Sequence, residues 1–142
     1  MPMDTLERGA CHGGNCHVAH DGTVTFFDFD CYSPGWRIFD LATFRWGTRL
    51  HGDDDEPRAA FLEGYRERRA VPDVDVAAVP LFVAIRHIWL LGLHTGNADD
   101  WSHGWLTDGY IDRGLTFLRE WMGAQIGGLL EGGPAAGQGA RP

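Results

Sequence analysis

An unusually apolar segment from Val79 to Leu93 most constrains what this chain can fold into. Its apolar residues cover most of the circumference of a helix, which is typical of a helix at the centre of a core. Pro80 suits the first turn, and we expect the helix to end near His94. The segment is too short to span a bilayer and carries charged side chains, so a buried helix is predicted. The residues expected at the centre of the core are Leu81, Phe82, Ile85, Ile88, Trp89 and Leu91 to Leu93.

One β-hairpin and three further helices are predicted around this segment. The β-prone runs CHVA and TVTFFDF, joined by a turn at Gly22, indicate a hairpin over residues 16–30. The sequence SPG indicates a second turn at residues 33–35. The fold class is therefore α+β, mostly α. The other helices are predicted over residues 36–46, 57–70 and 108–126. The signals used are the helical spacing of apolar residues and the residues typical of helix ends.

The length and composition fit a single soluble domain. We expect this domain to cover residues 1–131, and we expect a disordered tail over residues 132–142 because little in the tail could be buried. The net charge of −8 argues against partners that require a cationic surface, so neither nucleic acid nor membrane is expected. The first ten residues lack the apolar region of a signal peptide. Three cysteines without a C-x-x-C pair favour a reduced, cytoplasmic protein.

A cluster of cysteines and histidines raises the alternative of a zinc-binding domain, because thiolates and imidazoles are the usual zinc ligands. The spacing is unfavourable, since structural zinc sites use tight ligand pairs. Cys16 and His17 would also point to opposite faces of a strand. Zinc is therefore the weaker hypothesis. The cluster consists of Cys11, His12, Cys16, His17, His20 and Cys31.

Oxygen-bearing side chains at the two ends of the predicted hairpin favour magnesium instead. Asn15 precedes the hairpin and Asp28 follows its second strand, so the two side chains can point to one place. Asp30 shares a strand face with Asp28 if the strand continues. Two neighbouring carboxylates repel each other unless a cation lies between them. Hard oxygen ligands are those that magnesium prefers, and the segment therefore predicts a magnesium site.

The segment from residue 8 to about residue 46 also resembles a known family. It contains G-x-C-H-G-G-N ending at Asn15, then the predicted hairpin, then FFDFD, then DLA from Asp40. This order resembles the catalytic core of the aminoglycoside phosphotransferase and choline kinase group, whose fold is related to that of protein kinases. The closest similarity is to the bacterial stress-response kinase-like branch. The resemblance implies the helical C-terminal lobe of a protein-kinase-like fold, with the hairpin carrying the metal-binding residues.

The resemblance implies roles for individual residues. Asn15 and Asp28 match the two magnesium ligands that hold the nucleotide phosphates, and Asp30 matches an accessory acid near the same ion. Asp40 matches the acid that supports the catalytic loop through hydrogen bonds to its backbone. His12 matches a histidine found in many members, and it is grouped with Asp40 as structural support, although its role is left open. Magnesium and ATP are the implied cofactors.

Two departures from the family pattern suggest that the chain is catalytically incomplete. Ala10 occupies the position of the catalytic aspartate, and Arg8 replaces the histidine that opens the motif. Alanine can neither orient nor deprotonate a substrate hydroxyl. In addition, the residues before Arg8 are too few to form the N-terminal lobe that covers ATP, so only the C-terminal lobe is expected and ATP binding is doubtful.

The sequence therefore predicts a partial small-molecule phosphotransferase of the kind that transfers phosphate from ATP to a hydroxyl. The chain is expected to be inactive alone. Its partner would be a small hydroxyl acceptor, whose identity is left open, or a separately encoded N-terminal lobe. The alternative is a non-catalytic binding or regulatory module.

Overall fold

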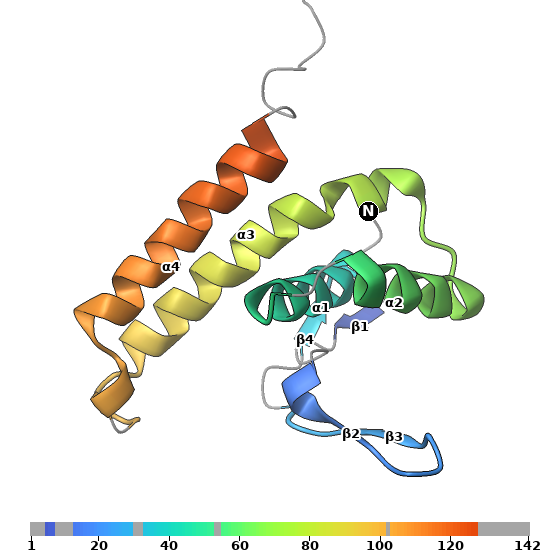
Figure 1. The fold of residues 1–142 in the computed structure, drawn as a ribbon, viewed down its shortest axis with the longest axis horizontal. Coiled ribbons are helices and arrows are strands. Elements are labelled where there is room, and N and C mark those ends of the chain that lie inside the picture. Colours follow the sequence, from blue (N-terminus) through green and yellow to red (C-terminus); the bar gives the residue numbers. More distant parts are fainter. Residues whose placement is uncertain (1–4, 8–12, 30–32, 53–54, 102, 128–142) are drawn as a thin grey trace, which may run out of the picture. The chain divides into compact units, whose positions relative to one another are not determined.

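The computed structural model describes residues 5–7, 13–29, 33–52, 55–101 and 103–127. The chain divides into two compact units, Met1–Leu90 and Leu91–Pro142, and each is described by itself. The first unit holds the strands, helices α1 and α2 and most of helix α3 (Figure 1). The second holds the end of α3 and the helix that follows it. The expected tail lies outside the described residues. The architecture is mostly helical with small antiparallel strand pairs, as the fold class predicts.

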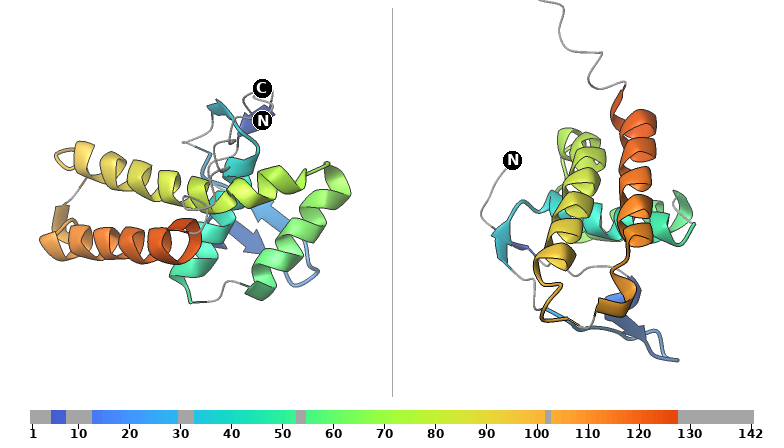
Figure 2. Two further views of the ribbon diagram at one scale, coloured as in Figure 1. Left: turned by 90° about the horizontal axis from the view of Figure 1, so that it is seen from above. Right: turned by 90° about the vertical axis from the view of Figure 1, so that its left-hand side faces the viewer.

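The predicted hairpin is confirmed. Strand β2 (Cys16–Val18) pairs with β3 (Val24–Phe26) in antiparallel register. Gly22 lies at a φ of +83°, which glycine adopts without steric cost, and its N–H donates to the carbonyl of Ala19 (2.9 Å). The Thr23 N–H donates to Asp21 Oδ1 (2.9 Å) and lowers the pKa of that exposed carboxyl. The hairpin extends away from helices α1 and α2 (Figure 2).

A second strand pair replaces the turn expected at residues 33–35. Strand β4 (Ser33–Gly35) pairs antiparallel with β1 (Thr5–Glu7), with Pro34 opposite Leu6. Proline is tolerated in a strand that lies at a sheet edge, because the N–H it lacks is not needed there. The prediction of a turn was wrong because the strand is defined by a partner distant in the sequence, which the local SPG pattern cannot reveal.

Helices α1 and α2 lie side by side in the first unit. Helix α1 (Ile38–Leu50) begins two residues later and ends four residues later than predicted, and α2 (Asp55–Arg68) begins and ends two residues earlier. The rings of Phe44 and Phe61 stack between these helices at a centroid separation of 3.9 Å. This contact shows that Phe61 of α2 packs against α1.

Helix α3 (Asp73–Gly96) begins seven residues before Pro80, so the predicted start was wrong. Asp73 and Asp75 lie in its first turn, where carboxylates favour the positive end of the helix dipole. The expectation that apolar residues would be buried all round was also wrong, because Leu81, Ile85, Ile88 and Trp89 are 40–58% exposed. Among the described residues, only one face of α3 is buried. It comprises Val79, Phe82, Val83, Ala84, Arg86 and His87.

The length of α3 changes one further expectation. With 24 residues, this helix is long and apolar enough to cross a membrane, contrary to the estimate from the shorter segment. Core helices of soluble proteins meet the same criterion. Arg86 and His87, which lie in the middle of α3, are buried against groups of the first unit, as described below. Of the apolar window of α3, however, only 33% is buried.

Helix α4 (Asp108–Trp121) continues as a π-helical turn, η3 (Met122–Ile126), and together they confirm the helix predicted over residues 108–126. Thr107 caps its start, because the Thr107 side chain accepts a hydrogen bond from the Tyr110 N–H (3.3 Å). The Tyr110 hydroxyl also hydrogen-bonds His94 Nδ1, which joins the end of α3 to the start of α4 within the second unit. Desolvation raises the pKa of Tyr110, so its hydroxyl stays protonated at neutral pH.

Replacing Thr107 with alanine should therefore destabilise the second unit. The loss of an N-cap oxygen leaves helix N–H groups unsatisfied and costs about 1 kcal/mol. Thr107→Ser keeps the oxygen and should cost less than half as much. Thermal unfolding followed by circular dichroism measures both variants, and equal melting temperatures for Thr107→Ala and the parent would contradict the capping role.

Candidate functional site

The hairpin brings the backbone of Asn15 next to the segment that carries Asp28. Asn15 ends a short 3-10 helix, η1 (Gly13–Asn15), directly before β2. Its carbonyl accepts a hydrogen bond from the Phe27 N–H (3.0 Å), which extends the β2–β3 ladder by one position. Asp28 follows immediately. The backbone segments that carry the two predicted magnesium ligands are thus adjacent across the open end of the hairpin, although they are distant in the sequence.

Asp28 has a backbone conformation that supports a functional role. Its φ is +60°, and no other residue except glycine has a positive φ in the described part of the chain. Such a conformation costs a residue with a Cβ atom about 1–2 kcal/mol. Strained backbone of this kind concentrates at functional sites, where the direction of a side chain outweighs stability. The Asp28 carboxylate is also exposed, and so accessible to a ligand.

Asp40 lies in the first turn of α1 and is half-buried. Helix α1 contacts η1, so the element that carries Asp40 adjoins the element that carries Asn15. The catalytic loop that Asp40 is expected to support includes residues 8–12, which lie outside the described residues. Its bracing role therefore stays a prediction.

Three other residues of the predicted site, Ala10, His12 and Asp30, lie outside the described residues. The donors that are described fit the expected metal, because an amide oxygen from Asn15 and a carboxylate from Asp28 are hard oxygen ligands. Half of the cysteine and histidine cluster of the zinc alternative is not tested. Cys11 and Cys31 also lie outside the described part, and within it no three His, Cys, Asp or Glu side chains group as metal ligands would.

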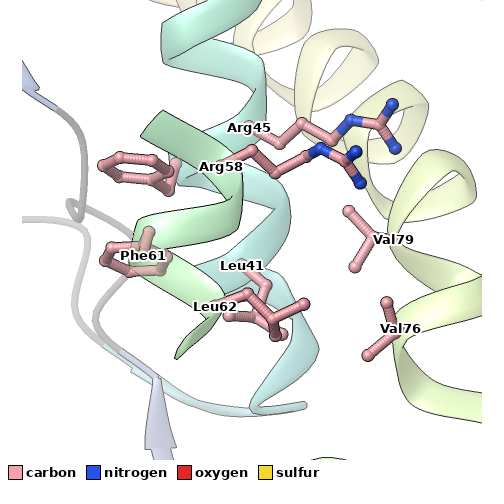
Figure 3. A pocket seen from close by; sticks show the side chains of 8 residues that line it. Leu41, Arg45, Arg58, Phe61, Leu62, Val76 and Val79 are labelled. Atoms are coloured by element: carbon pink, nitrogen blue, oxygen red, sulfur yellow. The ribbon is translucent and has the colours of Figure 1, made fainter. Parts of the chain in front are cut away.

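A small cavity lies between α1, α2 and α3 in the first unit, as Figure 3 shows. The guanidinium groups of Arg45 and Arg58 lie side by side at one end of it. Its volume is about 30 Å³, which suits a single water molecule and is far too small for a nucleotide. The cavity is thus a packing feature rather than a substrate site. Its lining comprises Leu41, Phe44, Arg45, Arg58, Phe61, Leu62, Val76 and Val79.

A buried polar cluster in the first unit was not predicted to be a site. The Trp46 Nε1–H donates to His87 Nδ1 (2.9 Å), and the Arg86 guanidinium lies 5.6 Å from the centroid of the Trp46 ring. Arg86 and His87 were visible in the sequence as adjacent ionisable residues within an apolar run. That pattern could have indicated a buried polar contact, but it could not identify Trp46 as the partner.

Comparison with known proteins supports the resemblance seen in the sequence. A sequence model described as the phosphotransferase enzyme family matches residues 9–76, which include Asn15, Asp28 and Asp40. The resemblance to this phosphotransferase family is thereby confirmed. The match to the phosphotransferase model extends through α2 to the start of α3, beyond the residues on which the resemblance was first based.

Two curated relatives of the phosphotransferase-like chain are themselves uncharacterized proteins. One, from Deinococcus radiodurans, is 41% identical over an alignment of 124 residues that covers 82% of this chain and 36% of the relative. The other, from Synechocystis, is 28% identical over 119 residues, or 84% of this chain and 33% of the relative. The chain therefore spans about a third of the length of these relatives. No solved structure matches.

Proposed function

We propose that this chain supplies the magnesium-holding part of a small-molecule phosphotransferase that acts on a hydroxyl group. The family match is the observation that carries the proposal, because it covers Asn15, Asp28 and Asp40 together. The left-handed backbone of Asp28 and its position beside Asn15 support it independently. Magnesium bound by these oxygens would neutralise charge on the nucleotide phosphates. Asn15 and Asp28 would orient the phosphates, Asp30 would add an acid nearby, and Asp40 and His12 would support the catalytic loop.

Nucleotide binding tests this proposal directly. The chain is titrated with a non-hydrolysable ATP analogue, with and without magnesium, by isothermal titration calorimetry. We expect weak binding that requires magnesium and that Asp28→Asn removes. Asp21→Asn is the matched control, because it removes the same charge from the same hairpin and keeps an oxygen that can accept from the Thr23 N–H. Magnesium-dependent binding that survives Asp28→Asn would contradict the assignment.

We further propose that the chain, taken alone, does not transfer phosphate. Ala10 occupies the position of the family's catalytic aspartate and has no group that could accept a proton. We expect no ATP turnover with small alcohols or aminoglycosides, and we expect Ala10→Asp by itself to restore none. Measurable phosphorylation of such a compound by the purified 142-residue chain would refute catalytic incompleteness.

A second candidate function is a non-catalytic binding module. The hairpin exposes several large apolar side chains, including Val18 (60%), Val24 (49%) and Phe26 (41%). Contiguous exposed apolar groups are characteristic of surfaces that contact another protein segment. The two functions are separated by the calorimetric titration, because a module without a magnesium site would bind no nucleotide.

A further inference from the structure

His87 is a buried histidine that the proposed phosphotransferase chemistry does not use. Its side chain is 7% exposed and lies on α3, with Trp46 of α1 as a hydrogen-bond partner. An indole N–H can only donate, so His87 Nδ1 must accept with its lone pair. The hydrogen bond therefore requires a neutral imidazole whose proton resides on Nε2. This condition makes the contact between α1 and α3 depend on the protonation state of one side chain.

The donor that faces His87 from α1 disfavours a second proton. On α3, the adjacent Arg86 is 5% exposed, and its guanidinium lies over the rings of Trp46, Phe39 and Trp89 at 5.1–5.8 Å. On α1, Trp46 presents its N–H to Nδ1 of His87. A proton on Nδ1 would place two donors opposite each other.

We propose that the Trp46–His87 pair is a proton-sensitive lock between α1 and α3. The lock is closed when His87 is neutral and opens when His87 gains a proton. Its opening would reach the candidate site, because α1 carries Asp40 and contacts η1, which ends at Asn15. The inference rests on the geometry of the first unit and does not require the proposed function.

The direction of the pH dependence follows from the two states of the chain. In the unfolded chain His87 takes up a proton with the ordinary histidine pKa of about 6.5. In the folded first unit, a proton on Nδ1 would break the hydrogen bond that Trp46 donates to it. Protons are then bound more readily by the unfolded state. Stability should therefore be full above about pH 6.5 and should fall as the pH drops below it.

Nuclear magnetic resonance of the full chain tests the lock without any change to His87. The indole N–H resonance of Trp46 is assigned by its loss in Trp46→Phe. At pH 7.5, the ring nitrogens of His87 should show a proton on Nε2 and a lone pair on Nδ1. On acidification, the resonance of the Trp46 indole proton should shift, and this proton should exchange faster with solvent. Both changes should follow the protonation of His87. An indole signal that stays unchanged while His87 titrates would overturn the proposal.

A substitution that keeps the acceptor but cannot titrate gives a second test. In His87→Asn, the amide oxygen can replace Nδ1 as acceptor for Trp46. Between pH 7 and pH 5.5, the melting temperature of the parent chain should fall by about 4 °C more than that of His87→Asn. His17→Asn, at an exposed position of β2, should show the same pH dependence of the melting temperature as the parent chain. If the melting temperatures of the parent and of His87→Asn fall equally between pH 7 and pH 5.5, the proposal is overturned. If His87→Asn does not fold, the indole titration of the parent decides.

Discussion

Replacing Phe82 with alanine should lower the free energy of unfolding by about 3–5 kcal/mol, the usual cost of removing a buried aromatic side chain. Phe82 is 6% exposed and lies on the buried face of α3. Its ring makes edge-to-face contacts with Trp36 (5.7 Å) and Phe39 (6.4 Å), measured between centroids. The substitution removes apolar burial, both ring contacts and the volume that the side chain fills. Because whole domains are stable by about 5–15 kcal/mol, the loss is a large fraction of the total.

Urea unfolding followed by far-ultraviolet circular dichroism measures this effect. Val74→Ala is the matched control, because Val74 lies on the same helix and is 72% exposed. A change at such a position should stay within about 0.5 kcal/mol. A loss below about 1 kcal/mol in Phe82→Ala would mean that the buried face of α3 does not form the core of the first unit.

Replacing Asp28 with glycine should separate function from stability. We expect magnesium-dependent nucleotide binding to weaken by at least about 100-fold, because a charged ligand is lost, whereas loss of a mere supporting group typically costs 10–100-fold. The free energy of unfolding should stay constant or rise by up to about 1 kcal/mol. Glycine relieves the cost of the positive φ, and this gain exceeds the backbone entropy that glycine adds to the unfolded chain.

Gly22→Ala is the backbone control for this prediction. Gly22 also has a positive φ in the same hairpin, and no atom lies within 4 Å of the place where a Cβ would stand. This variant should lose about 1 kcal/mol through backbone strain alone and should still bind nucleotide. The interpretation of Asp28 would fail if Asp28→Gly bound the magnesium–nucleotide complex like the parent. It would also fail if Asp28→Gly were destabilised as much as Gly22→Ala.

Local signals made much of the fold predictable. The hairpin follows from β-prone runs around a turn at Gly22, whose positive φ the structure confirms, and the helix over residues 108–126 was also predicted from the sequence. The start of α3 could not be predicted in the same way. Pro80 is compatible both with a first turn and, at some cost, with a position further along a helix. Residues 73–79 were therefore missed.

The candidate site was predictable as a set of residues but not as a geometry. The motif spacing identified Asn15, Asp28 and Asp40, and the family match covers all three. The left-handed backbone of Asp28 could not be read from the sequence, because aspartate is compatible with several conformations. Only the hairpin, with the Phe27–Asn15 hydrogen bond, shows which backbone atoms meet.

By itself, the sequence determined the mostly helical class, the hairpin and the phosphotransferase resemblance, because each depends on residues close together in the chain. The tertiary structure decided the β1–β4 pairing, the single buried face of α3 and the Trp46–His87 hydrogen bond, which joins residues 41 positions apart. Such contacts depend on how elements pack in space. Periodicity reveals which residues are apolar, but packing decides which of them are covered and which polar groups are buried with them.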